Sequence, residues 1–151
     1  AENIKNISIA VAPRYLKICN IMAPKTGLEA KFSFRLSAAM VLARRDTAVL
    51  STFSDEACDN EELIALRDQV SVSPDPKLSE TEAFVQVQTN DDKILNANFD
   101  INQPQSYKIK KEKLMHKASA LLGENTACQI WDVISLGDPE KFKTLTQFKL
   151  N

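Results

Sequence analysis

The chain begins with a stretch in which apolar and polar positions alternate. Ile7, Ile9 and Val11 occupy every second position within residues 4–12. This is the period of a strand that buries one face. Residues 70–73 (VSVS) repeat the pattern more briefly and end at a proline, so we expect a second, short strand there.

The clearest alternation lies in residues 83–100. Val85 and Val87 alternate with glutamines, and Leu95 and Phe99 alternate with asparagines, on either side of a polar TNDD stretch. Two alternating runs joined by turn residues predict a β-hairpin with one apolar and one wet face.

Between these strands, apolar residues recur at helical spacing from about Thr26 to Arg45. They are Leu28, Phe32, Leu36, Ala39, Met40 and Ala43. We therefore expect one continuous amphipathic helix, with these side chains on its buried face.

Start and stop residues predict four further helices. Residues 59–70 begin with an Asx cap and acids in the first turn, and residues 106–123 end at a glycine. Residues 125–137 run from a cap-like Asn125 to another glycine, and residues 138–150 begin with Asp-Pro. The order predicts one α+β domain over residues 1–151: a small, mainly antiparallel sheet, helices packed on one face and a helical C-terminal tail.

The amino-acid composition is that of a globular domain. The 151 residues are 44% hydrophobic and 26% charged, which suffices for a core. Lysine and arginine number 19 against 20 acids, so the net charge is -1, and we expect neither nucleic acid nor membrane as partner. Cys19, Cys58 and Cys128 lie far apart in the sequence, which favours buried thiols and a cytoplasmic protein without a metal site.

Several kinds of chemistry lack the residues they need. With three glycines in the chain, a glycine-rich phosphate loop is not expected, and the sequence predicts no cofactor. His116 is the one histidine and lies within a predicted amphipathic helix. A position on the helix surface is the simpler interpretation, although a small enzyme that uses His116 stays open as a hypothesis.

The start of the helix near residue 26 carries an unusual set of charges. Thr26 and Glu29 form a capping-box pattern, yet Lys25, Lys31 and Arg35 surround this end. Cations are unfavourable near a helix N-terminus unless an anion offsets them. One hypothesis is a carboxylate or phosphate site, with Lys31 as the point charge and the Ser33 hydroxyl as donor. The alternative is that the cations extend into water.

This segment also carries a family resemblance. TGLEAKFSFRLSAAMVLA (26–43) resembles the T-G-x-E-A-K-F-S segment that opens the C-terminal domain of the MmgE/PrpD family, which includes 2-methylcitrate dehydratase, cis-aconitate decarboxylase and iminodisuccinate epimerase. The FSDE stretch at residues 53–56, the hairpin of residues 83–100 and the helix around Lys117 are similar to later parts of that domain. The resemblance covers about residues 4–122.

The resemblance implies a lyase or isomerase that acts on small polycarboxylates without a cofactor. Lys31, Ser33 and Lys25 are then the candidates for substrate binding. The family's catalytic residues lie mainly in a preceding helical domain, so catalytic residues in this chain stay unknown, and we expect the isolated chain to be inactive. The resemblance further implies that the missing N-terminal helical domain is a partner and that the full protein is a homodimer.

One position departs from the family pattern. The family often continues K-F-S-x-x-Y, whereas this chain has Leu36 at the tyrosine position. Leucine can neither donate a hydrogen bond nor move a proton. A stand-alone binding or assembly module derived from the domain, using the tail of residues 124–151 as an interface, therefore remains an alternative.

Overall fold

The computed structural model describes residues 3–137, 140–141 and 143. Contacts group the chain into two compact units. The first comprises Ala1–Thr47 with Ser51–Gln103, and the second comprises Ala48–Leu50 with Pro104–Asn151. Within the described residues, no helix is both long and apolar enough to cross a membrane.

A four-stranded sheet forms the centre of the first unit. Its strands are β1 (Ile4–Val11), β2 (Val70–Pro74), β3 (Glu82–Thr89) and β4 (Ile94–Asp100), in the order β2-β1-β3-β4. β1 runs antiparallel to β3, and β3 antiparallel to β4, as the alternating pattern predicts. β1 and β2 form a parallel pair, which the sequence pattern did not indicate.

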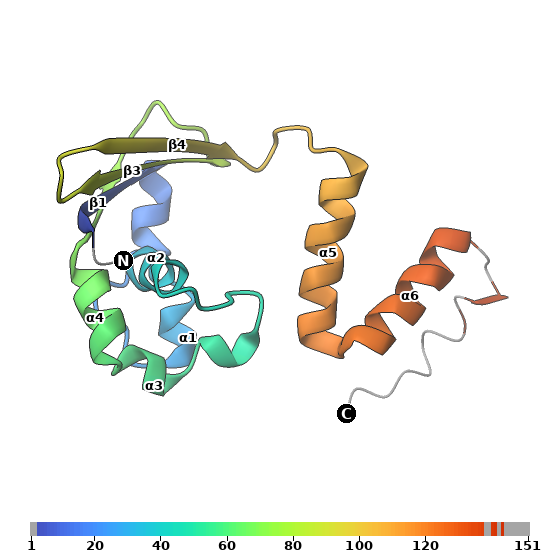
Figure 1. The fold of residues 1–151 in the computed structure, drawn as a ribbon. Coiled ribbons are helices and arrows are strands. Elements are labelled where there is room, and N and C mark those ends of the chain that lie inside the picture. The colour runs from blue at the N-terminus through green and yellow to red at the C-terminus, as the bar shows by residue number, and fades with distance from the viewer. Residues whose placement is uncertain (1–2, 138–139, 142, 144–151) are drawn as a thin grey trace. The chain divides into compact units, whose positions relative to one another are not determined.

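Short helices connect β1 to β2. They are η1 (Pro13–Lys17), α1 (Gly27–Ala30), α2 (Phe34–Leu42), η2 (Leu50–Thr52), α3 (Asp55–Cys58) and α4 (Glu61–Asp68). α2 contacts both β2 and α4, and Figure 1 shows these helices on one side of the sheet. The α+β class, with a mainly antiparallel sheet, is confirmed.

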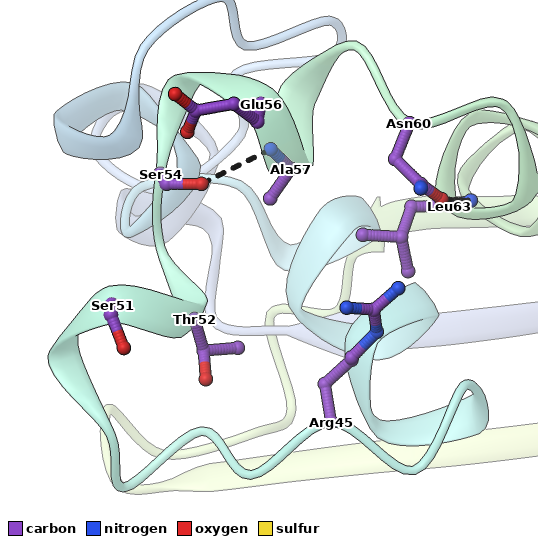
Figure 2. A pocket seen from close by; sticks show the side chains of 8 residues that line it. All are labelled: Arg45, Ser51, Thr52, Ser54, Glu56, Ala57, Asn60 and Leu63. Atoms are coloured by element: carbon purple, nitrogen blue, oxygen red, sulfur yellow. Dashed lines mark hydrogen bonds between the residues drawn. The ribbon is translucent and has the colours of Figure 1, made fainter.

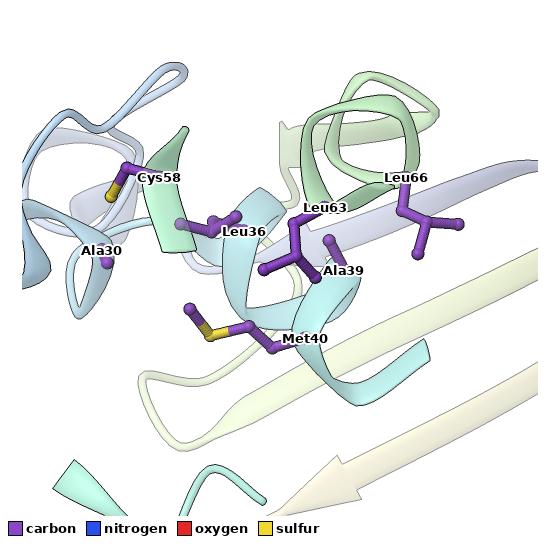
Figure 3. Packing of buried hydrophobic residues seen from close by; sticks show 7 residues of the cluster. All are labelled: Ala30, Leu36, Ala39, Met40, Cys58, Leu63 and Leu66. Carbon is purple, nitrogen blue, oxygen red and sulfur yellow. The ribbon is translucent and has the colours of Figure 1, made fainter. Parts of the chain in front are cut away.

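Two clusters of buried side chains hold this unit together. The first lies among the helices and consists of Ala30, Leu36, Ala39, Met40, Cys58, Leu63 and Leu66 (Figure 3). The second joins the sheet to α2 and consists of Ile7, Ile9, Val11 and Val70, with Phe34, Ala38 and Leu42 packed against it. The alternating residues of β1 therefore face the helices, because each second side chain points to the same side.

The prediction of one continuous helix from Thr26 to Arg45 is wrong. The helix stops after Ala30 and restarts at Phe34, because Ser33 adopts an extended backbone and its Oγ caps the new start. Serine offers the backbone this alternative bond wherever the geometry allows it. Leu28 and Phe32, predicted to be buried, are 67% and 40% exposed.

In its described residues, the second unit contains two consecutive helices, α5 (Tyr107–Leu122) and α6 (Glu124–Leu136). Gly123 separates them with φ 81, which confirms the predicted end of the first helix. α6 starts at Glu124, so the cap predicted at Asn125 is wrong. The helix predicted from Asp138 falls mostly outside the described residues.

An aromatic contact joins these two helices. The rings of Tyr107 and Trp131 lie 6.4 Å apart between centroids, and the Lys111 ammonium lies 4.9 Å from the Trp131 ring centre. Such cation–π contacts stabilise by about 0.5–1 kcal/mol at exposed sites. Ala127 is the one fully buried residue of α5 and α6.

Candidate functional site

The capping box predicted from the sequence is present at the start of α1. Thr26 Oγ1 accepts from the Glu29 backbone N–H at 3.2 Å, and Glu29 Oε2 accepts from the Lys25 backbone N–H at 2.7 Å. These two bonds satisfy donors that would otherwise be free at the helix end.

The glycine of the same motif is required by a close backbone contact. A Cβ atom at Gly27 would lie 2.3 Å from the Phe53 carbonyl oxygen, which is a backbone atom and cannot rotate away. The Gly27 N–H also donates to Asp55 Oδ1 at 2.7 Å. The two motif stretches of the family resemblance therefore contact each other. A carboxylate of the chain itself already occupies one donor of the predicted anion site.

Ser33 is built into the fold at the start of α2. Its side chain is 1% exposed, and its Oγ accepts from the Leu36 backbone N–H at 3.2 Å. The chain around Ser33 also pairs with an earlier segment through an antiparallel bridge to Asn20. The hydroxyl predicted to bind a ligand thus serves as a buried helix cap in this chain.

Lys25 and Lys31 both lie on the surface of the first unit. In the part of the chain that the structure describes, neither ammonium group forms an ion pair. Arg35 is half-buried, and its Nε is buried without a hydrogen-bond partner. The Leu28 and Phe32 side chains flank Lys31 in sequence and are exposed. Leu28, Lys31 and Phe32 are thus members of the motif whose side chains are exposed and take no part in the capping bonds described above.

Leu36, at the family's tyrosine position, is 0% exposed. It packs in the helical cluster with Met40 and Leu63 (Figure 3). In this chain, position 36 therefore points into the core, and the leucine contributes packing there.

A polar cavity of about 340 Å³ lies elsewhere in the first unit and was missed by the sequence interpretation. Its lining residues are Arg45, Ser51, Thr52, Ser54, Glu56, Ala57, Asn60 and Leu63 (Figure 2). The only sequence signals here are the cap residues Ser54 and Asn60, which start α3 and α4. The residues come together because a loop returns the chain from α2 to these helix starts.

His116 lies on the exposed part of α5, in the second unit. Among residues 3–137, 140–141 and 143, no group of three His, Cys, Asp or Glu side chains is arranged to hold a metal ion. His116 therefore has no cluster of potential ligands around it within the described part.

A family model described as the MmgE/PrpD C-terminal domain matches residues 1–131. The chain belongs to this family. The match to the MmgE/PrpD domain runs from the first strand into α6, as far as Trp131, so it extends beyond the residues that carried the resemblance. A search of curated proteins found no match.

Proposed function

We propose that this MmgE/PrpD chain is the substrate-facing, lid-like C-terminal domain of a cofactor-independent lyase or isomerase for small polycarboxylates. Lys31 binds a substrate carboxylate, and Lys25 adds positive charge nearby. A preceding helical domain supplies the catalytic groups, so the isolated chain is inactive. The complete protein is a cytoplasmic homodimer.

The observation that carries this proposal is that most polar residues of the segment 26–33 fix the backbone, whereas Lys31 does not. Thr26, Gly27 and Glu29 fix the local backbone, and Ser33 caps the next helix. Lys31 forms no ion pair within the described residues and points outward. A rigid turn that presents one unpaired cation is suited to bind the carboxylate of a substrate.

The experiment measures kcat/KM for citrate-like acids in a polypeptide that also contains the helical domain. We expect Lys31→Ala to lower kcat/KM by about 10²-fold, the effect of losing one charge-stabilising donor. Lys31→Arg should retain more activity than Lys31→Ala. Lys77, an exposed lysine in another loop, provides the matched control, and Lys77→Ala should behave as wild type. Wild-type kinetics in Lys31→Ala would reject the assigned role.

The second candidate function is a non-catalytic binding or assembly module. It is favoured by the exposed apolar side chains of Ile18, Met22, Leu28 and Phe32. A hydrogen bond from the Ile21 N–H to the Phe32 carbonyl brings the segments that carry them together. Apolar side chains gathered on one surface are typical of an interaction site. Stable self-association of the chain, together with inactivity of the two-domain polypeptide, would support this alternative.

A further inference from the structure

The cavity of Figure 2 is formed by a fixed loop and two helix starts. Arg44 has φ 57, which reverses the chain after α2, and the Arg45 N–H donates to the Met40 carbonyl at 2.8 Å. The Thr52 hydroxyl donates to the Asp46 carbonyl at 2.6 Å and so closes the loop. The Arg45 side chain extends from this loop toward Asn60 and Leu63 (Figure 2).

Two hydrogen-bond acceptors on the cavity wall are already used by helix caps. Ser54 Oγ accepts from the Ala57 N–H at 3.2 Å, and Asn60 Oδ1 accepts from the Leu63 N–H at 3.1 Å. Three groups on the wall can still donate: the Arg45 guanidinium, the Asn60 side-chain NH₂ and the Ser51 hydroxyl. Within the described residues, no protein acceptor is bonded to any of these three groups. Among the described residues, the cavity therefore offers three unused donors, one of which carries a positive charge.

The charges on the wall also concern Arg45. Among the described residues, Glu56 is the one acid that lines the cavity, and no acid forms an ion pair with Arg45. Its own backbone N–H and the Ser54 hydroxyl bind its carboxylate and lower its pKa. Figure 2 shows this carboxylate directed away from the guanidinium. The positive charge of Arg45 is thus available to a ligand.

We propose that this cavity binds a small organic monocarboxylic acid. The Arg45 guanidinium holds the carboxylate, Asn60 and Ser51 donate further hydrogen bonds, and the short carbon chain packs against Ala57 and Leu63. A single guanidinium matches one carboxylate in charge and planar geometry, whereas a phosphate dianion carries about two charges. The volume lies near the lower end of known ligand pockets, which start at about 300 Å³.

The site is independent of the activity proposed for Lys31, so its test needs no turnover. We would titrate the ¹⁵N-labelled chain with sodium butyrate and follow the amide signals by NMR, keeping ionic strength constant with sodium chloride. We expect saturable shifts at the cavity residues, with a Kd on the order of a few millimolar. Arg45→Gln should weaken binding at least about tenfold. Arg44→Gln removes the neighbouring arginine, which does not line the cavity, and should bind as wild type.

Three results would overturn the proposal. They are the absence of saturable shifts in wild type, equal affinity in Arg45→Gln, and inorganic phosphate binding at the same residues as tightly as butyrate. Arg45 is exposed, so glutamine at this position should leave the fold intact, and the amide spectrum of the variant verifies this directly.

Discussion

The two units of the chain differ in how they are stabilised. The first unit buries side chains from its sheet and helices in two clusters. In α5 and α6 of the second unit, only Ala127 is fully buried, and Leu114 and Leu121 are 57% and 45% exposed. The family match covers the whole first unit and the second unit as far as Trp131. A match along the sequence therefore does not indicate which part has its own core.

The largest effect is expected at Gly27, inside the first unit. Gly27→Ala would place a methyl group 2.3 Å from the Phe53 carbonyl oxygen, so the backbone of one segment must move. We expect a loss of about 3 kcal/mol or more in the free energy of unfolding, measured by urea denaturation.

Gly137 in the second unit provides the matched control for this substitution. Its φ is 62 and nothing lies within 4 Å of an added Cβ, so Gly137→Ala should cost only the left-handed strain of about 1 kcal/mol. A similar cost for both substitutions would contradict the close contact at Gly27.

The next prediction compares the two units by the same substitution, leucine to alanine, at one position in each. Leu36 is 0% exposed, and Leu36→Ala should destabilise the first unit by about 2–5 kcal/mol. Leu114→Ala, at a position 57% exposed, should change stability by no more than about 0.5 kcal/mol.

Trp131 is the only tryptophan and lies in the second unit, so its fluorescence reports on that unit alone. Far-UV circular dichroism follows both units. We expect Leu36→Ala to shift the dichroism transition more than the fluorescence transition. Equal shifts in both signals would mean that the two units unfold together.

A smaller effect is expected at two serine caps. Ser33 Oγ accepts from the Leu36 N–H at 3.2 Å in a buried position, whereas Ser106 Oγ accepts from the Ile109 N–H at 3.4 Å in an exposed one. Ser33→Ala should cost about 1–2 kcal/mol, and Ser106→Ala about 0.5 kcal/mol. Thermal denaturation of both variants measures the difference, and the reverse order of effects would be inconsistent with the structure.

The smallest expected effect is a difference in reactivity between two cysteine thiols, Cys58 and Cys128. Burial, followed by the negative charges of Asp55 and Asp59, raises the pKa of Cys58, so less of the reactive thiolate forms at a given pH. Cys128 is exposed. With iodoacetamide at pH 8, we expect Cys58 to react at least about tenfold more slowly than Cys128, as read by peptide mass spectrometry. Equal rates would show that the first unit opens readily.

The raised pKa of Cys58 also fixes the direction of a pH effect on stability. The pKa of Cys58 is higher in the folded state than in the unfolded state. The contribution of the neutral thiol to the free energy of unfolding is therefore complete below the pKa of the unfolded state, and it is lost as the pH rises through the pKa of the folded state. Cys58→Ser should weaken this dependence on the alkaline side.

The sequence pattern predicted correctly those strands and helices that are determined by residues close together in the sequence. The alternation of Ile7, Ile9 and Val11 gave the right strand because one sheet face is buried along its length. The spacing of Leu28, Phe32 and Leu36 continued across a break, so it indicated a single helix. The break depends on Ser33 and its pairing with Asn20, a contact that periodicity cannot reveal.

In the candidate site too, local bonds could be predicted from the sequence and long-range contacts could not. The bonds of Thr26 and Glu29 were predictable because they span only a few residues. The contact of Gly27 with Asp55 joins residues 28 apart in sequence, and the cavity around Arg45 depends on the loop that follows α2. The caps Ser54 and Asn60 mark helix starts in the sequence, but no local pattern shows that these residues meet Arg45.

The central claim is that this chain supplies the substrate-facing domain of a two-domain enzyme. The most direct test measures turnover of citrate-like polycarboxylates by the chain alone and by a polypeptide in which the family's helical domain precedes it. We predict no turnover by the chain alone, and turnover by the two-domain polypeptide that Lys31→Ala lowers by about 10²-fold. Turnover by the isolated chain, or a two-domain enzyme indifferent to Lys31→Ala, would contradict the account.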